Sequence, residues 1–112
     1  MALYRILEYQ DIAGRSPFKD WFDELDAVAA AKINVALTRL GQGNVSSVKG
    51  VGGGVLEFRS DFGPGYRIYF GKDGKDLVIL LGGGTKRRQQ HDIEAAFDRW
   101  GGDYKRRKKE AR

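Results

Sequence analysis

The sequence of 112 residues contains no cysteine and only one histidine. Without cysteine, a disulfide framework and a cysteine-based metal site are both excluded, and the composition fits a reducing cytosol. The lone His91 lies in the segment QQHDIE, where no spacing of histidines and carboxylates suggests metal ligation and no serine is placed for activation. We therefore predict a protein without a metal or another cofactor.

Long hydrophobic runs are also missing. The longest, LVILL at residues 77–81, is far shorter than the roughly 18–20 residues that cross a bilayer, and it suits a buried strand. The opening segment MALYRILEYQ carries charges among its apolar residues, which is unlike a signal peptide. We expect a cytoplasmic protein with a single domain over residues 1–112, long enough to bury a core.

What the sequence does contain is an uneven distribution of positive charge. The net charge is +5. Residues 1–56 hold six basic and six acidic side chains, whereas residues 57–112 hold fourteen basic and nine acidic ones. A basic half indicates a polyanionic partner, usually nucleic acid, or an acidic protein, with solubility alone as the alternative explanation.

The first half of the chain predicts one strand and two helices. Residues 2–9 are rich in branched and aromatic side chains, as in a strand. Ser16 followed by Pro17 is typical of a helix start, and Asp26 is typical of the start of a second helix that ends at Gly41. Each helix carries an apolar stripe at helical spacing: Phe18, Trp21, Phe22 and Leu25 in the first, and Ala29, Ile33, Ala36, Leu37 and Leu40 in the second.

The second half predicts three strands and one helix. Residues 41–54 contain six glycines without periodicity, which predicts a mobile loop before the first of these strands. Residues 55–71, VLEFRSDFGPGYRIYFG, predict two strands joined by a glycine–proline turn. A third strand over 76–81 is apolar on both sides, which is typical of a central strand, and is expected to stop at the glycines 82–84.

A helix is predicted over residues 86–100, with Thr85 as its cap. Its apolar stripe consists of Ile93, Ala96, Phe97 and Trp100. The basic tail at 103–112 is so polar that we expect it to be frayed or ordered only by a partner.

Alternation along the hairpin sorts its side chains onto two faces. If the apolar side chains share one face, Glu57, Arg59, Arg67 and Tyr69 share the other. The predicted fold class is α+β, with a mostly antiparallel sheet and helices packed on one face. The opposite face would be left open and would carry these four polar side chains.

Two arginines on one sheet face repel each other unless an anion lies between them. Glu57 is one such anion, as an ion-pair partner. A bound phosphate is the alternative, because arginine grips phosphate in a bidentate manner. Lys86, Arg87 and Arg88 follow the third strand and would complete a concave basic site if they fold beside the hairpin.

Such a site could cleave RNA without a metal. The ribose 2′-OH attacks the adjacent phosphate when a base takes its proton, while cations stabilise the added charge and an acid protonates the leaving oxygen. Arg59, Arg67 and Lys86 are the candidate cations. Glu57 is the only obvious base, and Tyr69 could stack on a nucleobase or donate a proton. Plain binding of nucleic acid or protein is the alternative that the chemistry alone favours.

The segments GVLEFRSDFGPGYRIYF and LVILLGGGTKRRQQHDIEAAFDRWGGDYKRR closely resemble the phage-type HigB-like branch of the RelE/ParE toxins. The resemblance begins at the first strand and SPFKDWFDELD and extends to the DYK of the tail. Its most specific part is Glu-x-Arg, then GPGYR-x-Y, then a leucine-rich strand with a Gly-Gly turn and a lysine. It implies the toxin half of a type II toxin–antitoxin module, with a small α+β fold and strand order 1-4-3-2.

RelE-like and HigB-like toxins typically cleave mRNA in the ribosomal A site without a metal, using basic residues of the sheet. By position, the resemblance makes Arg59, Arg67 and Lys86 catalytic candidates. Tyr69 and Tyr104 are the candidates for stacking or proton transfer. The histidines of some relatives have no counterpart, and many relatives carry Asp-Lys-Ser-Thr at 85–88. The residues expected to bind RNA outside the catalytic set are Arg87, Arg88, Tyr104, Lys105 and Arg106.

The resemblance also implies partners. These are the ribosome with its mRNA and an antitoxin with a helix-turn-helix domain of the XRE or HigA type, which represses its own operon in complex with the toxin. Basic tail residues could meet acidic antitoxin segments. Two alternatives remain: a ParE-type poison of DNA gyrase, and a toxin fold that binds antitoxin or nucleic acid without catalysis. The paired basic and tyrosine residues of the sheet favour the RNA hypothesis over gyrase.

Overall fold

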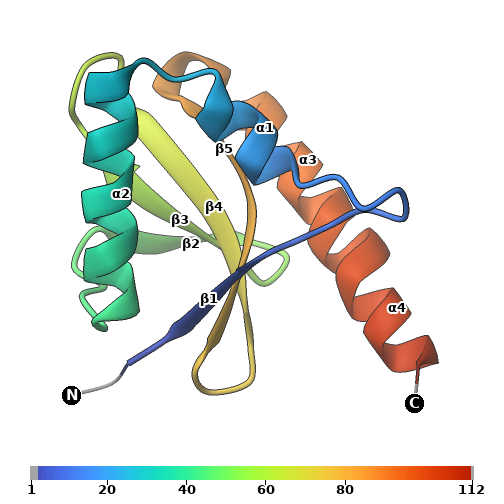
Figure 1. Ribbon diagram of the computed structural model, residues 1–112. Helices are drawn as coiled ribbons and strands as arrows, with labels where there is room; N and C mark the ends of the chain where they lie inside the picture. Colours follow the sequence, from blue (N-terminus) through green and yellow to red (C-terminus); the bar gives the residue numbers. More distant parts are fainter. Residues whose placement is uncertain (1–2, 112) are drawn as a thin grey trace.

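The computed structural model describes residues 3–111, which form one sheet flanked by helices (Figure 1). The strands are β1 (Arg5–Glu8), β2 (Val48–Gly52), β3 (Val55–Ser60), β4 (Tyr66–Asp73) and β5 (Leu77–Thr85). The helices are α1 (Pro17–Asp23), α2 (Ala27–Gly41), α3 (Gln89–Arg99) and α4 (Lys105–Glu110). A 3-10 turn, η1 (Lys86–Arg88), precedes α3, and a π-helical turn, η2 (Trp100–Tyr104), joins α3 to α4.

The five strands lie in the order β1-β5-β4-β3-β2. Strand β1 pairs with β5 in parallel, and the other neighbouring pairs are antiparallel. The four strands predicted from the sequence therefore have the expected order 1-4-3-2, and the α+β fold class is confirmed. The first strand, β1, is shorter than the predicted strand over residues 2–9, of which residue 2 lies outside the described residues.

Side-chain caps fix the starts of the first two helices, as the sequence predicts. Ser16 Oγ accepts a hydrogen bond from the backbone N–H of Lys19 at 3.1 Å, and Asp26 Oδ1 accepts one from Ala29 at 2.8 Å. The longest helix, α2, has 15 residues. Within residues 3–111, no helix has the length and apolar character needed to cross a membrane.

From its lack of periodicity we expected the glycine-rich stretch before the hairpin to be a loop throughout. The structure shows a strand in it. Residues Val48–Gly52 form the edge strand β2, which pairs antiparallel with β3. The chain reverses through Gly52, Gly53 and Gly54, whose φ angles are 102°, 59° and 80°. Because only glycine adopts these left-handed conformations without strain, the glycines make the tight turn that lets β2 fold back onto β3.

The glycines at 82–84 do not stop β5, which continues to Thr85. Each of them lets another element approach the sheet closely. A Cβ on Gly83 would lie 2.3 Å from the Trp21 ring of α1, whereas one on Gly84 would lie 1.9 Å from Asp92 Oδ2 of α3. The prediction was wrong because glycine was interpreted as a strand breaker, whereas here it makes room for helices on both faces.

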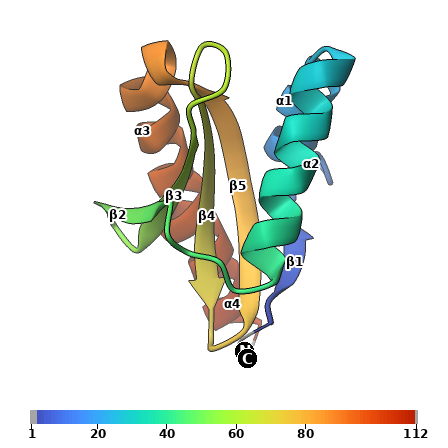
Figure 2. The same cartoon turned by 90° about the vertical axis from the view of Figure 1, so that its left-hand side faces the viewer.

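Helices cover both faces of the sheet, as the view in Figure 2 shows. The core beneath α1 and α2 includes Phe18, Ile33, Leu40, Phe58, Ile68 and Phe70. The core beneath α3 and η2 includes Val55, Tyr69, Ile79, Leu81, Ala96 and Trp100. The expectation of helices on one face and an open opposite face was therefore wrong, because the apolar stripe of the last helix packs on that second face.

The last helical segment also differs from the prediction at both ends. Thr85 occupies the cap position of η1, but its side chain makes no capping hydrogen bond. At the other end the tail is helical. Tyr104 Oη donates to Asp73 Oδ2 at 2.6 Å, and Arg107 donates to the carbonyl oxygen of Gln10 at 2.6 Å. These contacts hold α4 against the rest of the fold, so the expectation of a frayed tail was wrong for residues 103–111; residue 112 lies outside the described residues.

Candidate functional site

The strand register places the four polar hairpin side chains on one face, as predicted. Glu57 lies opposite Tyr69, and Arg59 lies opposite Arg67. Directly opposed residues of antiparallel strands point to the same side of the sheet. This side is the one that α3 covers, so burial rather than exposure decides what each side chain can do.

Glu57 is the centre of a buried polar network. It is fully buried, yet both of its carboxylate oxygens accept hydrogen bonds. Oε1 accepts from Arg59 Nε at 3.1 Å, and Oε2 accepts from Gln89 Nε2 at 2.7 Å. Burial alone would raise the pKa of Glu57, but the hydrogen bonds from Gln89 and Arg59 outweigh it and hold the pKa below its ordinary value. The carboxylate is therefore ionised at neutral pH.

Tyr69 is also fully buried. Its hydroxyl makes no hydrogen bond with the described residues. Burial, and then the neighbouring negative charge of Glu57, raises the pKa of Tyr69 far above its ordinary value. The phenol therefore stays protonated at neutral pH. With no exposed surface, its ring cannot stack on a nucleobase in this conformation, so the predicted stacking or proton-transfer role requires a movement of α3.

Arg67 is a nearly buried cation, with 4% of its surface exposed. Nη1 donates to the carbonyl oxygen of Tyr66 at 3.1 Å, and Nε lies 4.0 Å from Glu57 Oε1. Nε itself has no hydrogen-bond partner among the described residues. A buried guanidinium with an unused donor is unusual, because buried polar groups are nearly always hydrogen-bonded. Arg67 contributes a fixed, nearly buried positive charge beside the carboxylate of Glu57.

Lys86 is held beside Arg67 by the turn between β3 and β4. The backbone N–H of Lys86 donates to the carbonyl oxygen of Gly65 at 2.7 Å. Gly65 has a φ of 79°, and a Cβ there would lie 3.3 Å from Lys86 Cβ and 3.5 Å from Arg67 Nη1. Glycine at this position therefore brings the two basic residues next to each other.

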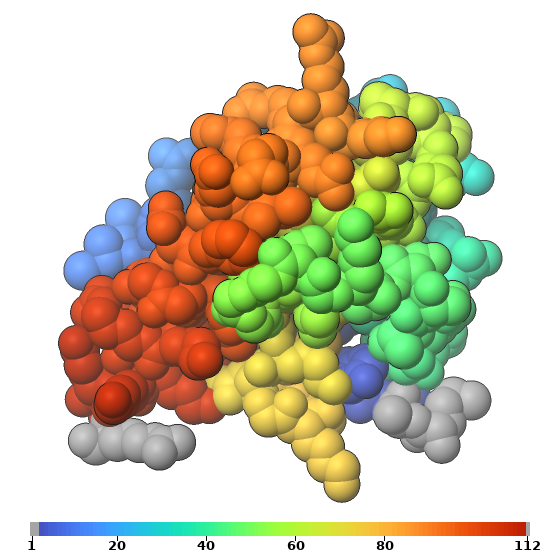
Figure 3. Space-filling view, turned by 180° about the vertical axis from the view of Figure 1, so that it is seen from behind, coloured from blue at the N-terminus to red at the C-terminus, as the bar shows by residue number. Residues whose placement is uncertain are grey.

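We call Arg59, Arg67 and Lys86 the arginine–lysine cluster. The Arg59 side chain is 42% exposed, and Lys86 is exposed. Arg87 and Arg88 follow in η1 and are also exposed. Figure 3 shows the orange segment after β5 projecting from the surface at the top of the view. The structure thus brings five of the predicted basic residues to one end of the hairpin.

The other predicted RNA-binding residues lie elsewhere. Tyr104 contacts Asp73, the last residue of β4, whereas Arg67 is the second residue of that strand. At about 3.3 Å per residue, the two ends of β4 are roughly 20 Å apart. Lys105 and Arg106 continue from Tyr104 into α4. The structure therefore does not join Tyr104, Lys105 and Arg106 to the arginine–lysine cluster.

Two residues of the site were not predicted from the sequence. Gln89 fixes Glu57, and Asp92 packs against Gly84 of β5 with Oδ2 buried and unpaired among the described residues. Burial raises the pKa of Asp92. The nearby Arg88, His91 and Arg99 favour its ionised form and partly oppose this rise. Neither polar residue stood out, because the start of an amphipathic helix normally faces water. The run of three consecutive glycines in β5, Gly82 to Gly84, was the one signal of a close helix approach.

The geometry divides the site into a binding part and a supporting part. The exposed cations can hold a phosphate, since arginine and lysine bind phosphate oxygens by charge-assisted hydrogen bonds. Glu57 lies behind them, where it is held by Gln89 and in turn fixes Arg59. Among residues 3–111, no group of three or more histidine or acidic side chains is arranged to hold a metal ion.

Comparison with known proteins identifies a family and a relative. A family model described as "Phage derived protein Gp49-like (DUF891)" matches residues 20–100. A protein of Haemophilus influenzae, described as an uncharacterized protein, is 44% identical over 80 residues, which cover 70% of this chain and 81% of the relative. The family match spans the hairpin, β5 and α3, so it contains the whole arginine–lysine cluster and the residues behind it.

Proposed function

We propose that this chain, which belongs to the Gp49-like family of phage-derived proteins, is the toxin of a type II toxin–antitoxin module and cleaves mRNA on the ribosome. The family is associated with toxin–antitoxin modules and is related to RelE-type toxins. The motifs of the hairpin and of β5 resemble those of the HigB-like branch, which supports the proposal. One observation carries the proposal: three cations converge where β3, β4 and η1 meet, and two of them are exposed.

The contribution of the protein to cleavage is electrostatic. The ribose 2′-oxygen attacks the adjacent phosphate and gives its proton to solvent water, while the bond from phosphorus to the 5′-oxygen of the next nucleotide breaks and that oxygen takes a proton from water. The phosphate gains negative charge in the transition state and ends as a 2′,3′-cyclic phosphate. Arg59 and Lys86 reach the phosphate from solvent, and Arg67 supplies a fixed positive charge behind them. Preorganised cations stabilise this charge better than water does, because they do not have to reorient during the reaction.

Glu57 is a positioning residue in this proposal rather than the general base. A base needs an accessible oxygen within hydrogen-bond reach of the proton that it removes. Both oxygens of Glu57 are occupied by Arg59 and Gln89, and the side chain has no exposed surface. Its role is to hold Arg59 at the edge of the cluster while balancing the charge of Arg67.

The partners follow from the same proposal. The toxin acts on mRNA bound to the ribosome, and a helix-turn-helix antitoxin of the XRE or HigA type neutralises it. The excess of positive charge in residues 57–112 supports both a nucleic-acid substrate and an acidic protein partner. A cytoplasmic location belongs to this proposal, since ribosomes are found there.

The test is cleavage of an mRNA in ribosomes paused on that message, mapped by primer extension. The variants are Arg59→Ala and Lys86→Ala, because both side chains are exposed, whereas Arg67→Ala would also remove a buried charge. We expect cuts in the A-site codon with the wild type and a loss of about 10²-fold or more in rate for each variant. Arg39→Ala removes an exposed cation at the C-terminal end of α2, away from the segment that follows β5 (Figure 1), and should leave the rate unchanged.

Each outcome separates this proposal from its alternatives. Cleavage by the wild type that survives both substitutions would move the site away from the cluster. No cleavage by folded protein, together with inhibition of DNA gyrase supercoiling, would support the ParE-type alternative. No effect in either assay would support a binding protein without catalysis, for which the burial of Glu57 and Tyr69 is the specific structural support.

A further inference from the structure

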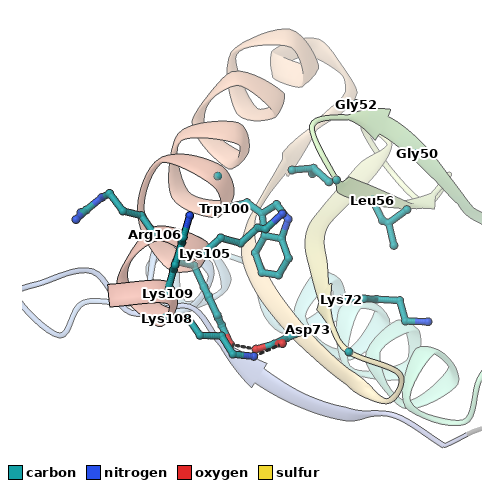
Figure 4. Close-up of a pocket in the computed structure, with 15 residues that line it drawn as sticks. Gly50, Gly52, Leu56, Lys72, Asp73, Trp100, Lys105, Arg106, Lys108 and Lys109 are labelled. Atoms are coloured by element: carbon teal, nitrogen blue, oxygen red, sulfur yellow. Dashed lines mark hydrogen bonds and ion pairs between the residues drawn. The ribbon is translucent and has the colours of Figure 1, made fainter. Parts of the chain in front are cut away.

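A second basic site lies at the opposite end of β4. A groove of about 930 Å³ runs between the β2–β3 hairpin, the β4–β5 turn and α4. Figure 4 shows Trp100 between α4 and the hairpin, with Lys72 and Asp73 on the side of the β4–β5 turn. Gly50, Gly52 and Gly54 form the wall that the hairpin contributes. In Figure 3 the green hairpin lies across this face, above the yellow β4–β5 turn and beside the red helix.

The groove carries an excess of positive charge. Five basic residues line it, namely Lys72, Lys105, Arg106, Lys108 and Lys109. Two of them are balanced by acids, because Arg106 pairs with Asp103 and Glu110, and Lys108 pairs with Asp73. Lys105 and Lys109 are exposed and make no ion pair with any residue from 3 to 111. One turn apart on α4, they place two uncompensated charges along one wall.

The floor of the groove is apolar, and its tryptophan ring is not free for stacking. Trp100 is 4% exposed, and its ring is covered on both sides. Gly71 lies so close that a Cβ there would be 2.5 Å from the ring, and Tyr104 packs against it at 5.0 Å between centroids. Tyr104 also lines the groove and is partly exposed, but its ring packs on Trp100 and its hydroxyl donates to Asp73. Single-stranded nucleic acids bind mainly by stacking bases on free aromatic ring faces, of which this groove offers few.

The size of the groove also limits what can enter it. A volume of about 930 Å³ suits a drug-sized ligand or a few residues of extended peptide. It is too small for a nucleic-acid duplex. Of the three wall glycines, Gly50 has nothing within 4 Å of where a Cβ would lie, so another backbone can approach it closely, whereas Gly52 and Gly54 face Phe97 and Trp100. An occupant that is narrow, anionic and partly apolar matches these features.

We infer that this groove binds an extended acidic peptide segment of a partner protein, at a site separate from the arginine–lysine cluster. Acidic side chains of the peptide pair with Lys105, Lys109 and Lys72. Small apolar side chains between them pack on the floor formed by Leu56 and the edge of Trp100. Binding here does not require that the chain cleaves RNA, so the inference stands apart from the proposed function.

The test measures binding of a short fluorescein-labelled peptide that alternates glutamate with valine, by fluorescence anisotropy to the full chain. The groove variant is Lys105→Glu/Lys109→Glu. The matched control, Arg5→Glu/Lys32→Glu, makes the same change in net charge on exposed residues of β1 and α2. We expect the Kd of the groove variant to rise about tenfold or more, with little change in the control. Circular dichroism establishes that both variants fold.

Further probes identify the class of ligand. A peptide with glutamine in place of glutamate should not bind, and one with serine in place of valine should bind more weakly. Equal weakening by both double variants would show that net charge alone attracts the peptide, and would overturn the site. Loss of binding to an RNA hairpin or to oligouridine in the groove variant, with peptide binding unchanged, would assign the groove to nucleic acid and overturn the inference.

Discussion

The charge of Glu57 provides a direct test of the buried network. Glu57→Gln keeps the shape of the side chain but removes the charge. Both carboxylate oxygens accept a hydrogen bond, from Arg59 and from Gln89. Glutamine has only one oxygen, so its amide nitrogen must face one of these donors. The substitution therefore loses a hydrogen bond and leaves the buried Arg67 without its nearest anion.

The size of the effect follows from burial. Removing one partner from a buried ion pair typically costs about 3–5 kcal/mol, because the remaining charge stays out of water. Arg67 is 4% exposed and pays this cost, whereas the half-exposed Arg59 can be rehydrated. With an m-value of about 1–3 kcal/mol/M in urea, the midpoint of unfolding should fall by about 1 M or more. Exposed Glu94→Gln is the control, with an expected change within about 0.5 kcal/mol.

The same variant predicts a pH dependence. The pKa of Glu57 is lowered by folding, so its ionised form stabilises the protein fully above the unfolded pKa of about 4.3. This contribution is lost as the pH falls through the lower folded pKa. Urea unfolding at a series of pH values should therefore show the difference between wild type and Glu57→Gln shrinking in acid. An equal midpoint for Glu57→Gln and Glu94→Gln at neutral pH would refute the reasoning.

Two further substitutions test the packing of α3 and η2. Gly71→Ala would place a Cβ 2.5 Å from the Trp100 ring; we expect a loss of about 1–3 kcal/mol by thermal unfolding, whereas Gly101→Ala, with nothing within 4 Å, should be neutral or slightly stabilising. Asp92→Asn should stabilise the protein at neutral pH, because burial raises the pKa of Asp92 and its ionisation therefore costs stability as the pH rises above the unfolded pKa of about 3.9. Urea unfolding at pH 3 and pH 7 should show this gain only at pH 7, and a loss at pH 7 would contradict it.

The hairpin shows which structural features a local sequence pattern can predict and which it cannot. Alternation alone assigned Glu57, Arg59, Arg67 and Tyr69 to one face, and the register confirms it. The pattern did not give the burial of Glu57 and Tyr69, because an alternating strand looks the same whether its polar face meets water or a second layer. The covering layer comes from α3, whose Gln89 reaches Glu57 across 32 positions of sequence.

The glycines show the same limit of sequence-based prediction, because the sequence does not reveal which structural role a glycine has. A glycine turn, a glycine that breaks a strand and a glycine that admits a helix have the same sequence signature. Gly53 serves a turn, with a φ of 59°, whereas Gly84 lies in an extended strand beneath Asp92. Only the partner on the other side of the glycine distinguishes these roles.

Whereas the strand order was implied by the family resemblance, the sequence by itself determined the helix starts at Ser16 and Asp26, the α+β class and the concentration of positive charge in the second half. These features depend on caps, on periodicity and on composition, all of which act within a few residues or over the chain as a sum. Only the tertiary structure decided that Glu57 is a buried anchor, that Arg67 is a nearly buried cation and that the tail docks through Tyr104. These properties arise where distant segments exclude water together, which no local pattern records.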